Sequence, residues 1–488
     1  MCYKMPFENY QKNISEDNRM KKNKLLALLL SSVMVLSIAS CDMPLVDPSA
    51  SSESSTDAST DTKPTASEST EVPPDLEGYK ELTVAEVTDQ DDGKITIYAH
   101  NSEFIGLAEK YAGIKSDEYD LVEVSNNNKA YQEKLDAVLS DGNNAPDIFT
   151  CDAAYARKYL ASDNTIAVND LGIDYAECKN MFGYTLRFAS DKDNVIKGLA
   201  WKATPCGVFY ERSVAEQYLG TSDPNELAKS FATWDAVLES ARKVNTASNG
   251  KVKLFGGFTE VFDPYVDSKG GKWIMDGSLN YDPQLESFFD YAKTLYKENL
   301  TFKAEQWSKQ WTAKMSDRTV VSYWGSLQFA KYQLALNPGE GTTVNPTSGD
   351  WGLTTAPVNY FNGGTWVMAS KYCDKKATSG DIMRAVCINE ENLKDMLNNG
   401  EFVNNIKLIT QAASDDKFAL EWLGGQNPYP VLLSSAMNAD ATYMEPGDDD
   451  YKQVFKAVVG TYAAGSFKDI KEAKAAMDKQ LKEKGLLT

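Results

Sequence analysis

The reactive side chains of this sequence do not fall into any arrangement typical of catalysis. The chain contains no G-x-x-x-x-G-K-[ST] loop, no G-x-G-x-x-G after a strand, no H-E-x-x-H and no G-x-S-x-G. His100 is the only histidine, so a serine or cysteine nucleophile with an imidazole base would have to use this one residue. A lone histidine is more often structural or a ligand contact than a base. We therefore predict no catalytic residue.

Acidic residues are abundant, but none of them marks a site by its spacing. Seventy Asp and Glu supply any pair that glycoside hydrolysis would need, and nothing singles out two of them. The segment from Asp89 to Gly93 shares its acids with calcium loops but lacks the third acidic ligand, the turn glycine and the terminal glutamate. We expect a solvated linker there, with no metal and no cofactor.

Aromatic residues beside glycine carry a more specific signal. They stand at expected strand or loop ends: Tyr210, Trp273 after a Gly-Gly pair, Trp324 before Gly325, and Trp366 after Gly363-Gly364. Glycine lets the backbone approach another molecule closely, and an aromatic ring offers it a large flat face. Each of these rings could equally belong to a core. Their recurrence in both halves of the chain favours a ligand cleft lined with aromatic side chains.

Length and charge set limits on the class of protein. A chain of 488 residues exceeds what one hydrophobic core usually supports, which predicts two lobes. The net charge is −20, and it is −23 without the first 40 residues, which hold six basic and three acidic side chains. This sign argues against nucleic acid and anionic membrane surfaces as partners.

The N-terminus predicts secretion. Residues 25–39, LLALLLSSVMVLSIA, follow three lysines and are too short to span a bilayer comfortably, so we interpret residues 1–40 as a signal peptide, within which Met20 is a more typical start than Met1. The residues Ile38 to Cys41 resemble the lipobox of bacterial lipoproteins, which implies a lipid on Cys41. The remainder of 41–92 is acidic and rich in Ser and Thr, which predicts a disordered tether.

Five further cysteines are widely spaced and contain no C-x-x-C pair: Cys151, Cys178, Cys206, Cys373 and Cys387. This spacing supports neither a zinc site nor a dense disulfide framework. One or two bridges remain open, and buried free thiols are the favoured state.

The folded part begins with alternating strands and helices. Strands are predicted at 94–100, 119–124 and 147–150, with amphipathic helices between and after them. This β-α-β-α-β order predicts a parallel sheet covered by helices on both faces, with ligands at the carboxyl ends of the strands. A second α/β stretch begins with GVFYER at 207–212 and includes predicted strands at 253–257 and 319–326. Helices are expected at about 383–397 and 402–411 and over the last 40 residues.

Several segments together resemble the family 1 extracellular solute-binding proteins of bacterial ABC sugar importers, the wider group that contains maltose-binding protein. The resemblance is carried by the lipobox with its tether and by residues 146–173, 207–220 and 351–371 (WGLTTAPVNYFNGGTWVMASK). It covers essentially the whole mature chain through the order and spacing of these segments. Long insertions at about 261–280 and 336–349 depart from the family pattern and leave the number of sugar subsites open.

The resemblance implies a two-lobed, type II periplasmic-binding-protein fold. Lobe one would comprise 94–204 with about 356–428, and lobe two 205–355 with about 429–488. Crossings between lobes are expected at 203–207, at 355–358 and near 429–432. Ligand contacts are implied at Asn101, Ser102, Glu103, Asn127, Asp152, Tyr210, Trp273, Trp324, Gly363, Gly364 and Trp366.

The implied function is a lipid-anchored, extracellular binding protein that captures a carbohydrate, an oligosaccharide in particular, for a membrane permease. It would act as a monomer. Two other functions remain open at this point: the same fold carrying a non-sugar solute such as a peptide or polyamine, or acting as a sensor partner, and, more remotely, a secreted glycan hydrolase.

Overall fold

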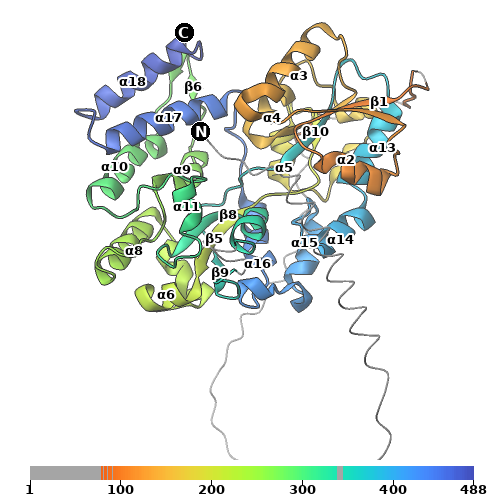
Figure 1. Ribbon diagram of the computed structural model, residues 1–488. Helices are drawn as coiled ribbons and strands as arrows, with labels where there is room; N and C mark the ends of the chain where they lie inside the picture. The colour runs from red at the N-terminus through yellow and green to blue at the C-terminus, as the bar shows by residue number, and fades with distance from the viewer. Residues whose placement is uncertain (1–77, 81, 85, 91, 338–344, 488) are drawn as a thin grey trace, which may run out of the picture. The chain divides into compact units, whose positions relative to one another are not determined.

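Two β-sheets, each flanked by helices, organise the chain into two lobes (Figure 1). The computed structural model describes residues 78–80, 82–84, 86–90, 92–337 and 345–487, all within one unit, Glu71–Thr488. The expected two-lobed α/β fold is confirmed. The signal peptide, Cys41 and most of the tether lie outside the described residues. The end of the predicted tether is a correction: Asp89 is not a solvated linker residue, because its carboxylate accepts hydrogen bonds from Thr378 N at 3.1 Å and from Thr378 Oγ1 at 2.5 Å, and Gln90 N donates to Asp374 O at 2.9 Å.

The first lobe contains a five-stranded sheet in the order β2-β1-β3-β10-β4. Strand β1 runs parallel to β2 and β3, whereas β10 is antiparallel to β3 and β4. The strands β1 and β3 are almost wholly buried, as expected for strands with helices on both faces. The bounds are β1 (Ile95–Ala99), β2 (Tyr119–Glu123), β3 (Ile148–Asp152), β4 (Gly198–Leu199) and β10 (Thr365–Ala369).

Seven α-helices surround this sheet. They are α2 (Glu103–Leu107), α3 (Ala130–Asp141), α4 (Ala153–Leu160), α5 (Gly183–Ala189), α13 (Lys376–Cys387), α14 (Glu390–Asn398) and α15 (Ile406–Ala413). A π-helical turn, η1 (Ala108–Ala112), continues α2. The start of α4 is fixed by Asp152, whose carboxylate accepts a hydrogen bond from Ala154 N at 2.9 Å.

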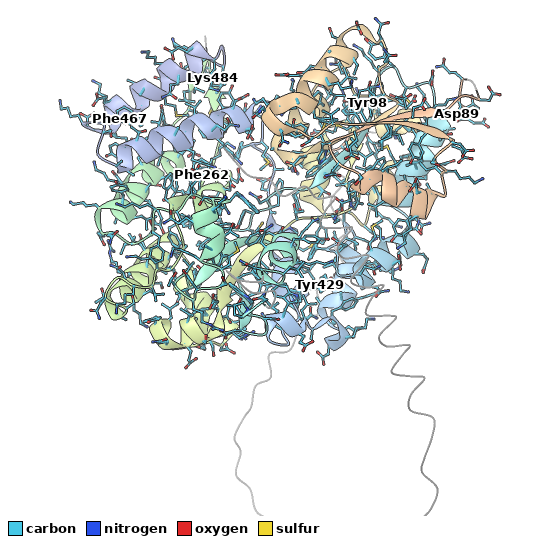
Figure 2. All side chains as sticks on the ribbon, in the orientation of Figure 1. Asp89, Tyr98, Phe262, Tyr429, Phe467 and Lys484 are labelled. Carbon is cyan, nitrogen blue, oxygen red and sulfur yellow. The ribbon has the colours of Figure 1, made fainter. Side chains whose placement is uncertain are left out.

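The second lobe contains a three-stranded antiparallel sheet in the order β8-β5-β9. All six residues of β5 are buried, and its side chains alternate between two cores. Phe209 joins the core that is continuous with the first lobe, whereas Val208 and Tyr210 join a separate core of the second lobe. Tyr98 and Phe262 mark these two cores in Figure 2. The bounds are β5 (Cys206–Glu211), β8 (Ser322–Ser326) and β9 (Trp351–Thr354), with a separate hairpin of β6 (Ile274–Met275) and β7 (Ser278–Leu279).

Helices from distant parts of the sequence pack around the second sheet. The C-terminal helices α17 and α18 lie alongside α10 (Figure 1). Phe289 of α10 meets Phe455 of α17 edge to face, with ring centroids 5.2 Å apart. The helices are α6 (Arg212–Leu219), α7 (Pro224–Leu227), α8 (Trp234–Ala247), α9 (Phe262–Asp267), α10 (Pro283–Lys297), α11 (Lys309–Ala313), α12 (Leu327–Phe329), the π-helical η7 (Ala330–Leu334), α17 (Asp448–Ala463) and α18 (Ile470–Glu483).

The chain passes from one sheet to the other twice, by neighbouring segments. It leaves β4 after Leu199 and enters β5 at Cys206, and it leaves β9 after Thr354 and re-enters the first sheet at Thr365. An antiparallel bridge between Pro205 and Phe361 links the two crossing segments.

Three local predictions differ from the structure. The expected strand at 253–257 makes only an isolated bridge, because Gly256 and Gly257 pack so closely on Trp311 and Ala304 that a Cβ at Gly257 would lie 2.2 Å from the Ala304 carbonyl oxygen. The stretch near 429–432, expected as a third crossing strand, is the first turn of helix α16 (Tyr429–Asn438), which lies between α15 of the first lobe and α17 of the second. The single helix expected at 383–397 is two helices, since Asn389 caps the start of α14.

The structure also bears on the cysteines and on membrane insertion. All five cysteines beyond Cys41 are buried free thiols, as favoured from the sequence. Within the described residues, no helix combines the length and the apolar character needed to cross a bilayer.

A buried carboxyl at the end of β5 makes stability depend on pH. Glu211 is fully buried, and neither of its carboxyl oxygens has a hydrogen-bond partner in the part of the chain that the structure describes. Burial raises the pKa of Glu211 to about 8, although Arg318, at 3.6 Å, works against this rise. Since the folded pKa lies above the unfolded value, the native state binds more protons between about pH 4.5 and pH 8. Stability is therefore full below this window and falls as the pH rises through it.

We expect Glu211→Gln to flatten this pH dependence. The variant should gain about 3–4 kcal/mol of unfolding free energy relative to the wild type between pH 5 and pH 8, because the amide has no proton to lose. Urea unfolding at several pH values measures this. Part of the slope should remain, since burial also raises the pKa of Glu260 to about 8. The control Glu216→Gln changes an exposed residue of α6, and an equal effect there would contradict the assignment.

Candidate functional site

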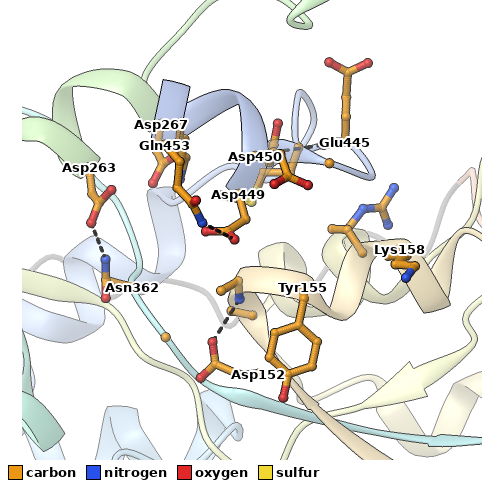
Figure 3. Close-up of a pocket in the computed structure, with 18 of the residues that line it drawn as sticks. Asp152, Tyr155, Lys158, Asp263, Asp267, Asn362, Glu445, Asp449, Asp450 and Gln453 are labelled. Carbon is orange, nitrogen blue, oxygen red and sulfur yellow. Dashed lines mark hydrogen bonds and ion pairs between the residues drawn. The ribbon is translucent and has the colours of Figure 1, made fainter. Parts of the chain in front are cut away.

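A cavity of about 370 Å³ lies where the two lobes meet (Figure 3). The first lobe contributes the start of α4, and the second lobe contributes α9 and the first turns of α17. The returning crossing segment supplies Phe361, Asn362 and Gly363. The cavity is therefore built by stretches that are far apart in the sequence, next to the two crossing segments.

On the first-lobe side, polar groups stand at the carboxyl end of the sheet. Asp152 is the last residue of β3, and Tyr155 follows it on α4 (Figure 3). Burial raises the pKa of Asp152, while its hydrogen bond from Ala154 N and the nearby His100 lower it. The phenol oxygen of Tyr155 is buried and has no hydrogen-bond partner among the described residues. The carboxylate of Asp152 is therefore the acceptor that this part of the wall offers to a ligand.

On the second-lobe side, a buried ion pair connects two helices. Lys452 of α17 pairs with Asp267 of α9, and only 20% and 6% of their side chains are exposed. Although burial opposes it, the carboxylate of Asp267 raises the pKa of Lys452. Nearby on α17, Asp449 accepts a hydrogen bond from Gln453 Nε2 at 2.7 Å (Figure 3). Burial raises the pKa of Asp449.

Two polar contacts at this cavity join the lobes. Asn362 Nδ2 of the returning crossing donates to Asp263 Oδ2 of α9 at 2.9 Å (Figure 3). Lys129 Nζ, from the loop before α3, lies 3.0 Å from Asp450 Oδ1 of α17. Both contacts are between partly exposed polar groups, which contribute little stability on their own.

Carboxylates outnumber basic groups around the cavity. The acids are Asp152, Asp263, Asp267, Glu445, Asp448, Asp449 and Asp450, and the bases are Lys129, Arg157, Lys158, Lys452 and Lys456. Lys158 pairs with Asp136 outside the cavity lining, and Arg157 donates to the carbonyl oxygens of Phe188 and Ser190. Hydrogen-bond acceptors are thus in excess, which suits a ligand that is rich in donors such as hydroxyl or amino groups. No cluster of three or more His, Cys, Asp or Glu that could hold a metal ion occurs in the described part of the chain.

A small slot of about 20 Å³ adjoins the cavity. Asp263 and Asn362 line both hollows. The other residues around the slot are Glu260, Pro264, Gln306, Trp307, Trp324, Gly325, Ser326, Phe329 and Tyr360. The site therefore continues from a charged region into an aromatic one.

The structure brings together only part of the residues predicted from the sequence. Asp152 and Gly363 line the cavity, and Trp324 lines the slot. Eight predicted residues line neither hollow: Asn101, Ser102, Glu103, Asn127, Tyr210, Trp273, Gly364 and Trp366.

The polar residues at the end of β1 are engaged with the protein. Asn101 Oδ1 accepts a hydrogen bond from Glu103 N at 3.0 Å. Glu103 Oε1 lies 2.5 Å from Nζ of Lys202, a residue of the first crossing. Sugar recognition by Glu103 would have to compete with this ion pair.

Four aromatic residues predicted to face the ligand lie in the cores, which contradicts that prediction. Tyr210 and Trp273 are fully buried, Trp366 is 1% exposed, and Trp324, although it borders the slot, is 2% exposed and belongs to the second-lobe core. The indole of Trp366 is covered by Phe188, with ring centroids 4.2 Å apart, and its Nε1 donates to Thr185 O at 3.3 Å. The Gly-Gly pair before Trp366 is explained by backbone conformation, because Gly363 and Gly364 both adopt positive φ.

Most of the second-lobe wall was missed from the sequence. Asp263 and Asp267 fall in the insertion that departs from the family pattern, and the acids at 448–450 stand in the first turn of α17. Three consecutive acids before an amphipathic helix indicate a helix start, because they favour the positive end of the helix dipole. Such a pattern gives no sign that the helix end also faces a cavity.

We expect Trp366→Ala to act on stability. Removing this buried indole should lower the unfolding free energy by about 3–5 kcal/mol, through lost burial and the cavity left behind. Chemical denaturation measures the loss. The matched control is Trp307→Ala, whose side chain is 58% exposed and should cost less than about 1 kcal/mol. Similar losses in the two variants would contradict the placement of Trp366 in the core.

Comparison with known proteins identifies the fold. No family model matches the sequence, and no curated protein matches it. An extracellular solute-binding protein of family 1 is 16% identical, with a TM-score of 0.67 over 79% of this chain and 99% of that chain. A binding protein associated with an ABC transporter of B. animalis subsp. lactis Bl-04, in complex with β-1,6-galactobiose, is 20% identical, with a TM-score of 0.60 over 81% and 98%. A cyclo/maltodextrin-binding protein complexed with maltotetraose is 12% identical, with a TM-score of 0.60 over 81% and 99%. This chain therefore has the two-lobed fold of the extracellular solute-binding proteins of the maltose-binding type.

Proposed function

We propose that this chain is the substrate-binding protein of an ABC importer and captures a carbohydrate, an oligosaccharide in particular, between its lobes. The observation that carries the proposal is a cavity built by both lobes at the crossing segments and rich in hydrogen-bond acceptors. Sugar hydroxyls are donors that such acceptors can bind. The ligands named for similar structures, β-1,6-galactobiose and maltotetraose, support the sugar class.

Capture requires binding energy and no covalent chemistry. A micromolar dissociation constant corresponds to about −8 kcal/mol, which a set of hydroxyl hydrogen bonds and ring contacts can supply. A ligand that touches Asp152 of one lobe and Asp449 of the other gains both contacts only when the lobes are close. It therefore favours the closed arrangement over an open one.

The proposal includes attachment and delivery. A lipid on Cys41 would hold the protein at the extracellular face of the cell membrane, and the acidic segment that follows it, up to about residue 78, would act as a tether. The loaded protein, a monomer, would deliver its ligand to membrane permease subunits.

The excess of acids favours one alternative, a cationic solute such as a polyamine. The carboxylates of Asp152, Asp448 and Asp449 have no basic partner within ion-pair distance among the described residues. An ammonium group could bind there as a point charge. The same carboxylates can accept hydrogen bonds from sugar hydroxyl groups. The acids alone therefore do not distinguish a polyamine from a sugar.

A calorimetric panel separates these functions. We expect heat of binding with one or more neutral oligosaccharides, such as β-1,6-galactobiose, lacto-N-biose or maltotetraose, at a dissociation constant on the order of micromolar. We expect none with spermidine or tripeptides. The sugar proposal fails if only the spermidine or peptide samples bind.

The panel also includes a check for turnover. Chromatography of each glycan after prolonged incubation with the protein should show the glycan unchanged. Product formation would instead favour a glycan hydrolase.

A further inference from the structure

Trp307 differs from every other tryptophan of the chain. Its side chain is 58% exposed, whereas the other eight are buried or partly buried. Its backbone adopts φ of +68°. A bulky residue in this left-handed region is a conformational outlier, and such strain persists only when the surroundings hold it.

Neighbouring contacts hold Trp307 in place. Its indole ring meets the rings of Trp311 and Phe329, with centroids 5.3 Å and 5.7 Å away. Trp311 is itself fixed, because its Nε1 donates to the buried carboxylate of Glu260 at 2.5 Å. The backbone N of the preceding Gln306 donates to Thr259 Oγ1 at 3.0 Å. The exposed indole of Trp307 is therefore held in one position by its aromatic neighbours, and the backbone beside it is held by a hydrogen bond.

Trp307 stands at the edge of the charged cavity. It lines the slot whose other lining residues include Asp263 and Asn362, and those two also line the cavity. The slot itself, at about 20 Å³, has room for about one water molecule, so a sugar ring could only lie against the exposed part of the indole. Ser326 and Gln306 supply polar groups beside the ring. An apolar face with polar neighbours matches a pyranose, which has apolar CH faces and a polar rim.

We propose that Trp307 is the platform of a second sugar subsite, so that the ligand is an oligosaccharide with one ring on Trp307 and the next in the charged cavity. The inference rests on the proposed function and extends it. Asp263 and Asn362 lie between the two subsites and would contact the ligand where its two rings join. The chain length of the ligand is then at least two residues, and a monosaccharide can occupy only one subsite.

The experiment compares three variants of the full chain by calorimetry. The probes are β-1,6-galactobiose, lacto-N-biose and maltotetraose, each beside its monosaccharide components. In Trp307→Ala, the affinity for the oligosaccharides that the wild type binds should fall about tenfold or more, with an unchanged melting temperature. Trp307→Phe should retain most of the affinity. Tyr296→Ala removes a 38% exposed aromatic of α10 that lines neither hollow, and it should bind as the wild type does.

Fluorescence supplies a second readout. Sugar binding should shift the emission of the wild type to shorter wavelength, because the exposed indole loses water contact. This shift should disappear in Trp307→Phe even though binding persists. A ring that only supports the local structure would leave the shift in place.

The outcomes separate the two proposals. If the wild type binds none of the sugars, the proposed function fails and the subsite fails with it. If the wild type binds sugar and Trp307→Ala binds equally well, the subsite alone is overturned. Loss of transport in cells with unchanged binding in Trp307→Ala would also overturn it, since the exposed indole would then be a contact for the permease.

Discussion

The pairing of the two crossing segments is the constraint on which the site depends. Besides the bridge between Pro205 and Phe361, Cys206 N donates to Tyr360 O at 3.0 Å and Asn362 N donates to Thr204 O at 3.2 Å. These bonds run along both strands of the connection, so one crossing cannot shift along the other without breaking them. The returning crossing then places Asn362 and Gly363 in the cavity wall. The lobes are thereby joined at the floor of the site that they share.

The second-lobe wall of the cavity depends on the C-terminal helix α17, which packs beside elements that are far from it in the sequence. Helix α17 packs on α10 through aromatic rings, and its first turn carries Asp448, Asp449 and Asp450 to the cavity. These acids also favour the N-terminus of the helix that bears them, so part of their presence is explained by helix stability alone. The buried pair of Lys452 and Asp267 then fixes α17 on α9. The acids of this wall therefore serve either the start of α17 or the ion pair between α17 and α9. Only the carboxylates without a basic partner are available to a ligand.

The sequence predicted the parts of the fold whose signals are local. The strands β1, β3 and β5 have apolar patterns that fix their burial, and Asp152 was found because it follows a buried parallel strand. The stretch at Tyr429 was predicted as a crossing strand and is a helix, although Pro430 suits the first turn of a helix, where its missing N–H costs nothing.

The aromatic part of the site could not be predicted in the same way. The Gly-Gly pair before Trp366 predicted that another group would pack closely on this ring. That group belongs to the protein's own core, since Phe188 and Thr185 contact the indole. Trp307 has no glycine next to it. Its exposure follows from a left-handed backbone and from rings that come from α11 and α12, and neither is visible in the residues around it. Burial of an aromatic ring is decided by tertiary partners, which neighbouring residue types do not specify.

The ion pairs around Lys202 are more buried than the ion pair at the cavity. Lys202, on the first crossing, has only 9% of its side chain exposed and contacts Glu103 and Glu401. Glu401 also pairs with Lys331 of η7, which follows the second-lobe strand β8, at 3.2 Å. Breaking such a buried network leaves uncompensated charge and costs several kcal/mol.

At the cavity, by contrast, the pair of Lys129 and Asp450 is 47% and 28% exposed, and such pairs contribute at most about 1 kcal/mol. If the lobes separate, the contact at the cavity is therefore the one that breaks, while the network around Glu401 stays intact. A ligand that bridges Asp152 and Asp449 adds its contacts at the cavity, where the protein's own contacts between the lobes are weak. The binding free energy of the ligand therefore sets the balance between the open and closed arrangements.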